Sequence, residues 1–120
     1  MGRFRYTHTR VIGDQRHVWN VERLWQLAAE LPVIEIAVAD ISELEQDCWF
    51  SDTPPTVRAV TEHCRRIMQA DLRTPIILNA DGALMDGGHR VARALLEGVD
   101  KLPAVRFATA PPPDVVEPDV

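Results

Sequence analysis

One short stretch of the chain combines residue types that could bind an anion: Asp86, Gly87, Gly88, His89 and Arg90 follow one another. The apolar pair before them predicts the end of a strand, and the residues after them predict a helix. A helix N-terminus exposes unpaired N–H groups and a partial positive charge, so it attracts anions. Glycines let the backbone approach a phosphate closely, and His89 and Arg90 add side-chain donors. We therefore predict a phosphate-binding turn here.

Two flanking side chains could extend this turn. Arg93 follows Arg90 by one turn of the predicted helix, so it could supply a further guanidinium fork. Asp86 could cap the helix, hold His89 or hold a metal-bound phosphate. A purely structural interpretation competes, because strand-to-helix turns often need glycine for packing, an acid as a cap and arginine on a solvated face. The His-Arg pair after the glycines favours the functional interpretation.

The elements that must position the turn follow from the local pattern. A hairpin of two short strands should precede the turn, and a helix and a closing strand should follow it. Gly98 stands where a glycine normally ends a helix. In chain order we expect a strand at 75–79, a turn at 79–82, a strand at 83–85, a helix at 89–97 with Val91, Ala94 and Leu95 inward, and a strand at 102–107.

Upstream, two more helices and a strand are expected. Asn20 should cap a helix that Pro32 stops, and residues 33–41 are mostly β-branched and predict a strand. A second helix should run to about Ala70. It would be capped by Asp52 or Thr53, with Pro54 or Pro55 in its first turn, and would bury an apolar stripe of Val57, Val60, Cys64, Ile67 and Met68, with His63 on its flank.

The predicted organisation is one small α+β domain with a short mixed sheet and three main helices. Residues 1–19 would be a basic arm or an edge strand, residues 20–108 the domain, and residues 109–120 a disordered, acidic, proline-rich tail. Cys48 and Cys64 form no disulfide framework. No apolar run reaches the roughly 20 residues that span a bilayer, so a cytoplasmic protein without a membrane partner is expected.

The net charge of −5 argues against broad, nonspecific affinity for nucleic acid. Its distribution leaves one alternative open, because residues 1–23 carry five arginines against two acids. DNA binding through Arg3, Arg5, Arg10 and Arg16 is therefore possible in principle but is not favoured.

The segment ILNADGALMDGGHRVARALLEGVDKLPAVRF resembles the core of the ParB N-terminal/sulfiredoxin-like superfamily, a family also called ParB-like nuclease domains. Its members share a strand–turn–strand unit, a glycine-rich element with His-Arg or Arg-Arg opening a helix, and a closing strand. The resemblance covers about Pro75 to Phe107. It implies a small α+β fold that binds a nucleotide triphosphate or diphosphate (ATP, ADP or CTP), with Mg²⁺, whose phosphates rest on Gly87, Gly88, His89 and Arg90.

Departures from the family pattern separate its branches. Sulfiredoxins place a nucleophilic cysteine directly before the His-Arg pair, and this chain has Gly88 there, so sulfinic-acid reduction is not expected. Partition proteins carry a helix-turn-helix domain downstream, whereas this chain resembles a stand-alone domain. Free-serine kinases of this fold use an acid after the first strand as general base, and Glu43, Glu45 and Asp47 stand in a comparable place.

Two functions with a working site remain after this comparison, and a structural homodimer whose site has decayed is a third option. A small phosphotransferase or nucleotide hydrolase would have Glu43 or Glu45 facing His89 and Arg90 across a phosphate-sized gap, since phosphoryl transfer needs a group to orient the nucleophile and a cradle for the charge. A non-catalytic, nucleotide-binding regulatory module, associated with DNA or a protein partner, would instead cluster the N-terminal arginines. A homodimer is compatible with either function, and no metal site made of side chains is predicted.

Overall fold

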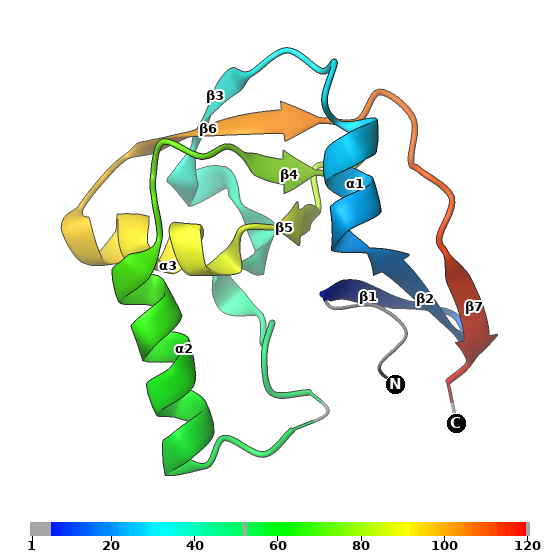
Figure 1. The fold of residues 1–120 in the computed structure, drawn as a ribbon, viewed down its shortest axis with the longest axis horizontal. Helices are drawn as coiled ribbons and strands as arrows, with labels where there is room; N and C mark the ends of the chain where they lie inside the picture. The colour runs from blue at the N-terminus through cyan, green and yellow to red at the C-terminus, as the bar shows by residue number, and fades with distance from the viewer. Residues whose placement is uncertain (1–5, 52, 120) are drawn as a thin grey trace.

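The structure is a computed structural model that describes residues 6–51 and 53–119. In these residues the chain forms three α-helices and seven strands in two sheets (Figure 1). The predicted α+β class is thereby confirmed. The predictions made for Arg3, Arg5 and Asp52 lie outside the described residues.

The N-terminal residues build a small antiparallel sheet. Strand β1 (Thr7–Ile12) pairs with β2 (Gln15–Asn20) through a tight turn at Gly13, whose φ is 64°. Strand β7 (Val115–Pro118) pairs with the other side of β2, so the order is β1-β2-β7. Residues 1–19 are predicted to form either a basic arm or an edge strand, and Thr7–Ile12 form an edge strand.

The prediction of a disordered tail is wrong for the described part of residues 109–120. Besides the β7 pairing, Trp19 Nε1 donates a hydrogen bond of 2.9 Å to the carbonyl of Pro111. The Asp114 carboxylate accepts from the backbone N–H of Asn20 at 2.7 Å and pairs with Arg23 at 2.8 Å. Proline and acid content predicted disorder, but contacts with residues about a hundred positions away hold the segment. The predicted domain therefore does not end at residue 108, because the segment that follows pairs with β2.

The second sheet is mixed, as predicted, and carries the candidate turn. Its order is β3-β6-β4-β5, in which β4 and β6 are parallel and the other neighbours are antiparallel. The strands are β3 (Ile34–Ala37), β6 (Lys101–Arg106), β4 (Ile76–Leu78) and β5 (Leu84–Asp86).

Two apolar clusters cover the two faces of this sheet, because side chains alternate along a strand. Ile76 of β4 belongs to the cluster that includes Val91 and Ala94 of helix α3 (Gly88–Glu97). The next residue, Ile77, belongs to the cluster that includes Leu24 of helix α1 (Val21–Leu27). The sheet is thus held between α3 on one face and α1 on the other, which fixes the point where β5 leads into α3 (Figure 1).

The helix starts differ from expectation in one case of three. Asn20 caps α1 as predicted, its side chain accepting from the N–H of Glu22 at 3.1 Å. Helix α2 (Val57–Gln69) is capped by Thr56, which accepts from Ala59 at 3.1 Å. The predicted cap at Thr53 is wrong, and Pro54 and Pro55 precede the helix rather than opening it. The helix begins where a side chain can accept from a first-turn N–H group, and Thr56 does so.

The apolar stripe of α2 is exposed, and the expectation that it is buried is wrong. Val57 is 86% exposed, Met68 is 63% exposed, and Cys64 is also exposed. Of the predicted stripe only Ile67 is half-buried, and the other half-buried positions of α2 are Ala59 and His63, where α2 lies against α3. Leu95, expected inward on α3, is 57% exposed as well.

The predicted strand over 33–41 is shorter than expected. Strand β3 ends at Ala37, and two short 3-10 helices follow, η1 (Val38–Asp40) and η2 (Ser42–Glu45). They turn the chain toward the segment that leads to α2. Across the described residues, no helix has the length and apolar character required to span a membrane.

Candidate functional site

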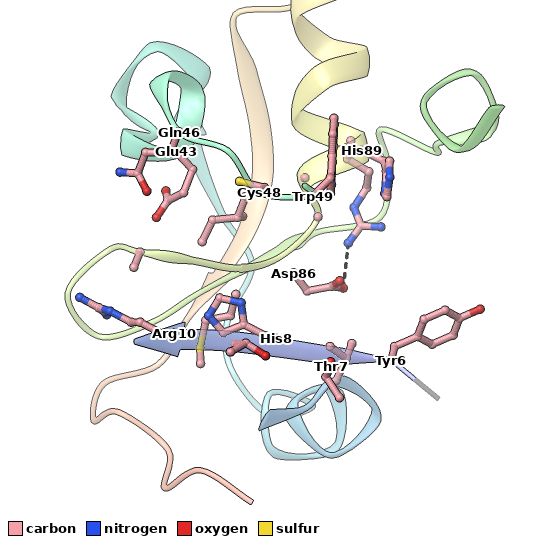
Figure 2. Close-up of a pocket in the computed structure, with 18 of the residues that line it drawn as sticks. Tyr6, Thr7, His8, Arg10, Glu43, Gln46, Cys48, Trp49, Asp86 and His89 are labelled. Atoms are coloured by element: carbon pink, nitrogen blue, oxygen red, sulfur yellow. Dashed lines mark hydrogen bonds and ion pairs between the residues drawn. The ribbon is translucent and has the colours of Figure 1, made fainter. Parts of the chain in front are cut away.

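A cavity of about 1190 Å³ lies where the start of α3 meets β1, η2 and α2. Gly87, Gly88, His89 and Arg90 all line it, as does Asp86 at the end of β5. Figure 2 shows Asp86 between the β1 residues on one side and Trp49 and His89 on the other. The sequence-predicted turn therefore opens onto a cavity of about 1190 Å³.

The glycine pair has two different structural roles. Gly87 has a φ of +118° and a Cβ atom there would lie 2.5 Å from Cγ2 of Ile76, so packing requires glycine. A Cβ on Gly88 would lie 3.4 Å from Nε1 of Trp49. Gly87 is also the N-cap of α3 and has no side chain to bond the first N–H groups of the helix. Packing against Ile76 thus supports the structural interpretation of Gly87, and the uncapped helix start is compatible with an anion.

Asp86 positions Arg90 rather than capping the helix. Its Oδ2 accepts from Nε1 of Trp25 at 2.9 Å and from Nη2 of Arg90 at 3.3 Å. Arg90 Nη2 also donates to the carbonyl of Pro75 at 3.2 Å, and the guanidinium lies 6.0 Å from the centre of the Trp25 ring. Arg90 Nε is buried without a hydrogen-bond partner among the described residues, which leaves one donor of the guanidinium unused.

His89 has a partner that the sequence did not reveal. Its Nε2 lies 2.8 Å from Nδ1 of His63 on α2, and both imidazoles stack against Trp49. The sequence pattern predicts His63 only as a flanking residue of the apolar stripe. Its only sequence signal is that it is a polar ring next to that stripe, and nothing local connects it to a residue 26 positions away.

The imidazoles in the cavity are shifted toward their neutral forms. Burial, and then the charges of His63 and Arg66, lower the pKa of His89 to about 4, and Asp86 only partly opposes this. Burial, followed by the charge of Arg10, also lowers the pKa of His8 on β1. At neutral pH both rings are uncharged, so each can take up a proton when an anion binds nearby.

The two candidate carboxylates occupy different places. Glu43 lines the cavity and accepts a hydrogen bond of 3.0 Å from Ser42 Oγ. Glu45, two residues further along the same short helix, is exposed and does not line it. Of the pair predicted as general bases, the structure brings only Glu43 into the cavity.

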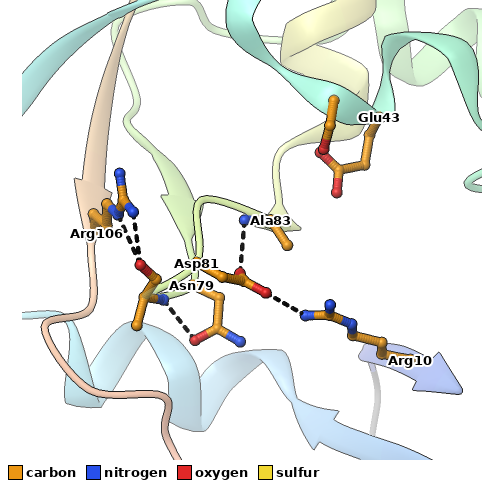
Figure 3. Close-up of polar contacts among 8 residues, drawn as sticks. Arg10, Glu43, Asn79, Asp81, Ala83 and Arg106 are labelled. Atoms are coloured by element: carbon orange, nitrogen blue, oxygen red, sulfur yellow. Dashed lines mark hydrogen bonds and ion pairs between the residues drawn. The ribbon is translucent and has the colours of Figure 1, made fainter. Parts of the chain in front are cut away.

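The cavity wall opposite α3 is closed by a contact that the sequence did not predict. Arg10 of β1 donates to Oδ2 of Asp81 at 2.9 Å, and Oδ1 of Asp81 accepts from the N–H of Ala83 at 3.0 Å (Figure 3). In the same view Arg106 of β6 bonds the carbonyl of Ala80, and Glu43 faces the turn from above. The β1 strand is thereby held against the β4–β5 turn, and its His8 and Arg10 join the cavity lining.

Arg93 does not line this cavity, so it leaves the candidate site. It bonds Glu97 on its own helix and the carbonyl of Met68, and lies 3.4 Å from the carbonyl of Ile67. The one-turn spacing that suggested a second fork places Arg93 on the side of α3 that packs against α2. It ties the two helices together.

Metal binding by side chains alone finds no support in the described residues, where no three His, Cys, Asp or Glu residues gather as a metal site. Mg²⁺ is commonly held through one or two carboxylates and the substrate's phosphates. Glu43 or Asp86 could serve in that way. Asp86 already accepts from Trp25 and Arg90, which leaves Glu43 the freer of the two.

Comparison with protein-family models, with curated proteins and with solved structures found no match for this chain. The resemblance to the ParB N-terminal/sulfiredoxin-like superfamily therefore stays a prediction from the sequence. The functional argument depends on the geometry of the cavity itself.

Proposed function

We propose that this protein binds a nucleotide (ATP, ADP or CTP) with its phosphates at the N-terminus of α3. The observation that carries the proposal is that this helix start opens onto the cavity beside His89 and Arg90. Its unpaired N–H groups and partial positive charge favour an anion. The guanidinium of Arg90 and the neutral imidazole of His89 line the same cavity and add groups that can interact with one.

The size and lining of the cavity support a ligand as large as a nucleotide. Its volume of about 1190 Å³ exceeds that of most pockets for small molecules. Arg66 adds positive charge to the lining, and the Trp25 and Trp49 rings add apolar surface. Mg²⁺ bound to the phosphates would offset the carboxylates that also face the cavity.

A phosphotransferase or nucleotide hydrolase is the second proposal, and Glu43 supports it. The carboxylate lines the same cavity as His89, so it could orient an attacking hydroxyl or water. The reduction of sulfinic acid stays excluded from the proposal. Gly88 replaces the required cysteine, and burial, reinforced by Glu43 and Asp47, raises the pKa of Cys48, which makes its thiol a poor nucleophile.

The alternative of a regulatory module acting on DNA is less well supported. Arg10 and Arg16 are already paired with Asp81 and Asp119, at 2.9 Å and 3.1 Å. Their charges are therefore partly neutralised within the protein. We also propose a homodimer that forms through the exposed stripe of α2. A cytoplasmic location is the last part of the proposal.

Binding is tested by isothermal calorimetry with ATP, ADP, CTP and GTP, each with and without Mg²⁺. We expect at least one nucleotide to bind, and His89→Ala and Arg90→Ala to weaken it by roughly tenfold or more, as for loss of a charge-assisted hydrogen bond. Arg73→Ala is the matched control, because Arg73 is exposed and bonds only Asp71 among the contacts seen. Equal affinity in all three variants would place the site elsewhere.

A further inference from the structure

The rings of Trp49, His63 and His89 form one layered arrangement, which we call the ring cluster. His63 Nδ1 and His89 Nε2 are 2.8 Å apart and the imidazole planes differ by 15°, so the two rings lie edge to edge. The indole is nearly parallel to both, with ring centres 4.7 Å from His63 and 4.8 Å from His89. One indole therefore covers both members of a hydrogen-bonded pair.

The ring cluster lies at the start of α3. A Cβ on Gly88 would be in contact with Nε1 of Trp49, at 3.4 Å, so the indole lies against the first residue of the helix. His89 is the second residue, and Figure 2 shows Trp49 beside it at the cavity. The first N–H groups of a helix are the ones that hold an anion. Trp49 is thus next to the proposed phosphate position.

Ring contacts join the segment that carries Trp49 to α2 and α3. Oδ1 of Asp47 accepts from the N–H groups of Trp49 and Phe50, at 2.9 Å and 2.8 Å, which shapes a local turn. The Phe50 ring meets Trp49 and His63 edge-on, at 86° and 81°. Among the interactions of residues 46–51, those that reach α2 and α3 are ring contacts. Such a segment can move without breaking a strand or a helix.

We propose that Trp49 is a displaceable cover of the anion site: it packs on the His63–His89 pair in the free protein and moves away when an anion binds at the start of α3. The inference rests on the proposed function for the identity of its ligand. An anion that takes a hydrogen bond from His89 Nε2 must break the bond between His89 and His63. Breaking that bond removes the flat surface on which the indole lies.

The paired imidazoles also make the cover sensitive to protons. The bond between them needs a proton on one facing nitrogen and a lone pair on the other, so a doubly protonated pair would turn two N–H groups toward each other. Burial and then Arg66 lower the pKa of His63, which Glu62 opposes, and the pKa of His89 is lowered to about 4. The other charged groups near the pair are Arg66 and Glu62 on α2, Asp86 and Arg90 at the turn, and Asp47 in the Trp49 segment. At neutral pH the pair is neutral and the cover is closed.

The test follows the indole N–H signals of ¹⁵N-labelled protein by NMR, with the Trp49 signal assigned through Trp49→Phe. The two probes are sulfate and ATP with Mg²⁺. Sulfate is chosen because it stays a dianion near neutral pH, so its own charge does not change during the titration. We expect either probe to shift the Trp49 signal and to leave that of Trp19, which is bonded to Pro111, in place. Binding without movement of the Trp49 signal would overturn the cover while leaving the proposed function intact.

Two variants make the test sharper. Trp49→Ala should bind sulfate roughly threefold or more tighter, because the free protein no longer has to displace the indole. Equal or weaker binding would contradict the cover. His63→Phe keeps a ring beneath the indole but removes the bond and the charge that act on His89, so the pKa of His89 should rise toward 6.5. An unchanged pKa of His89 would show that the pair does not act as proposed. If neither the wild type nor either variant bound sulfate or ATP, both the cover and the proposed function would be overturned.

Discussion

Gly87 lies so close to Ile76 that a Cβ atom would be 2.5 Å from Cγ2 of that side chain. Ile76 is fully buried in the middle of the mixed sheet, so it cannot move aside cheaply. The glycine that begins the proposed phosphate turn is therefore required first by packing. The role that we propose for it in binding depends on the same contact, because the contact fixes where α3 starts and where its free N–H groups point.

Gly87→Ala should destabilise the protein by about 3 kcal/mol or more, since it adds backbone strain at positive φ to overpacking in the core. Gly98→Ala is the matched control: Gly98 also has a positive φ, of +68°, but nothing lies within 4 Å of its Cβ position. It should lose only about 1 kcal/mol, the cost of a left-handed residue. Urea unfolding measures both, and equal losses would show that contact with Ile76 is unimportant.

Stability should fall as the pH is lowered from 6.5 toward 4. The pKa of His89 is about 4 in the folded protein against 6.5 as its ordinary value, so between these pH values the unfolded chain binds more protons. The stabilisation is complete above pH 6.5 and is lost on descent to about 4. The melting temperature of the wild type should drop across this window.

His89→Gln is the comparison for that experiment, because it cannot take up a proton. Its melting temperature should fall less between pH 6.5 and 4 than that of the wild type. His8, His63, Asp71 and Asp81 also have lowered pKa values and add to the pH dependence, but both proteins contain them, so the difference between the two curves reports His89. Parallel curves for the two proteins would assign the pH dependence to other groups.

Glu43→Gln should reduce nucleotide turnover if the protein is an enzyme. The carboxylate lines the cavity, and loss of a general base typically costs a factor of about 10² to 10⁴ in rate. Glu45→Gln is the matched control from the same 3-10 helix, because Glu45 does not line the cavity. Phosphate release from ATP or CTP is the measurement. Turnover that both variants retain in full would remove Glu43 from the mechanism.

Truncation after Thr109 should destabilise the protein markedly. It removes strand β7, the partner of the Trp19 indole and the Asp114 carboxylate that bonds Asn20. Each buried hydrogen bond left unmade costs about 1–3 kcal/mol, and Trp19, now 3% exposed, would lose its cover. Urea unfolding and a red shift of tryptophan emission report the change. If the truncated chain were as stable as the full one, residues 110–120 would not contribute to the fold, as expected for a disordered tail.

A milder variant separates the Asp114 contacts. Asp114→Asn keeps an acceptor for the N–H of Asn20 but removes the ion pair with Arg23, which is mostly buried. We expect a loss of about 1 kcal/mol, near the upper end for a partly exposed pair, and a smaller effect in high salt. An effect as large as that of the truncation would mean that the charge, rather than the strand, holds the segment.

The sequence by itself determined the local unit around the turn. The hairpin of β4 and β5, the start of α3 near His89, its end at Gly98 and strand β6 all follow from signals a few residues apart: apolar runs, glycines and helix periodicity. The same local signals identified Asn20 as a cap and predicted the α+β class. Periods and caps act over one or two turns of chain, so they can be recognised without the rest of the molecule.

Only the tertiary structure decided which surfaces meet. Arg93 and Glu45 have the residue types that a site needs, but the packing of α2 on α3 and the direction of η2 place them outside the cavity. The contact of His63 with His89 and the pairing of β7 with β2 join residues 26 and about 100 positions apart. Which face of an amphipathic helix is buried, and which distant strand completes a sheet, depend on the shape of the whole core, and no local pattern contains that information.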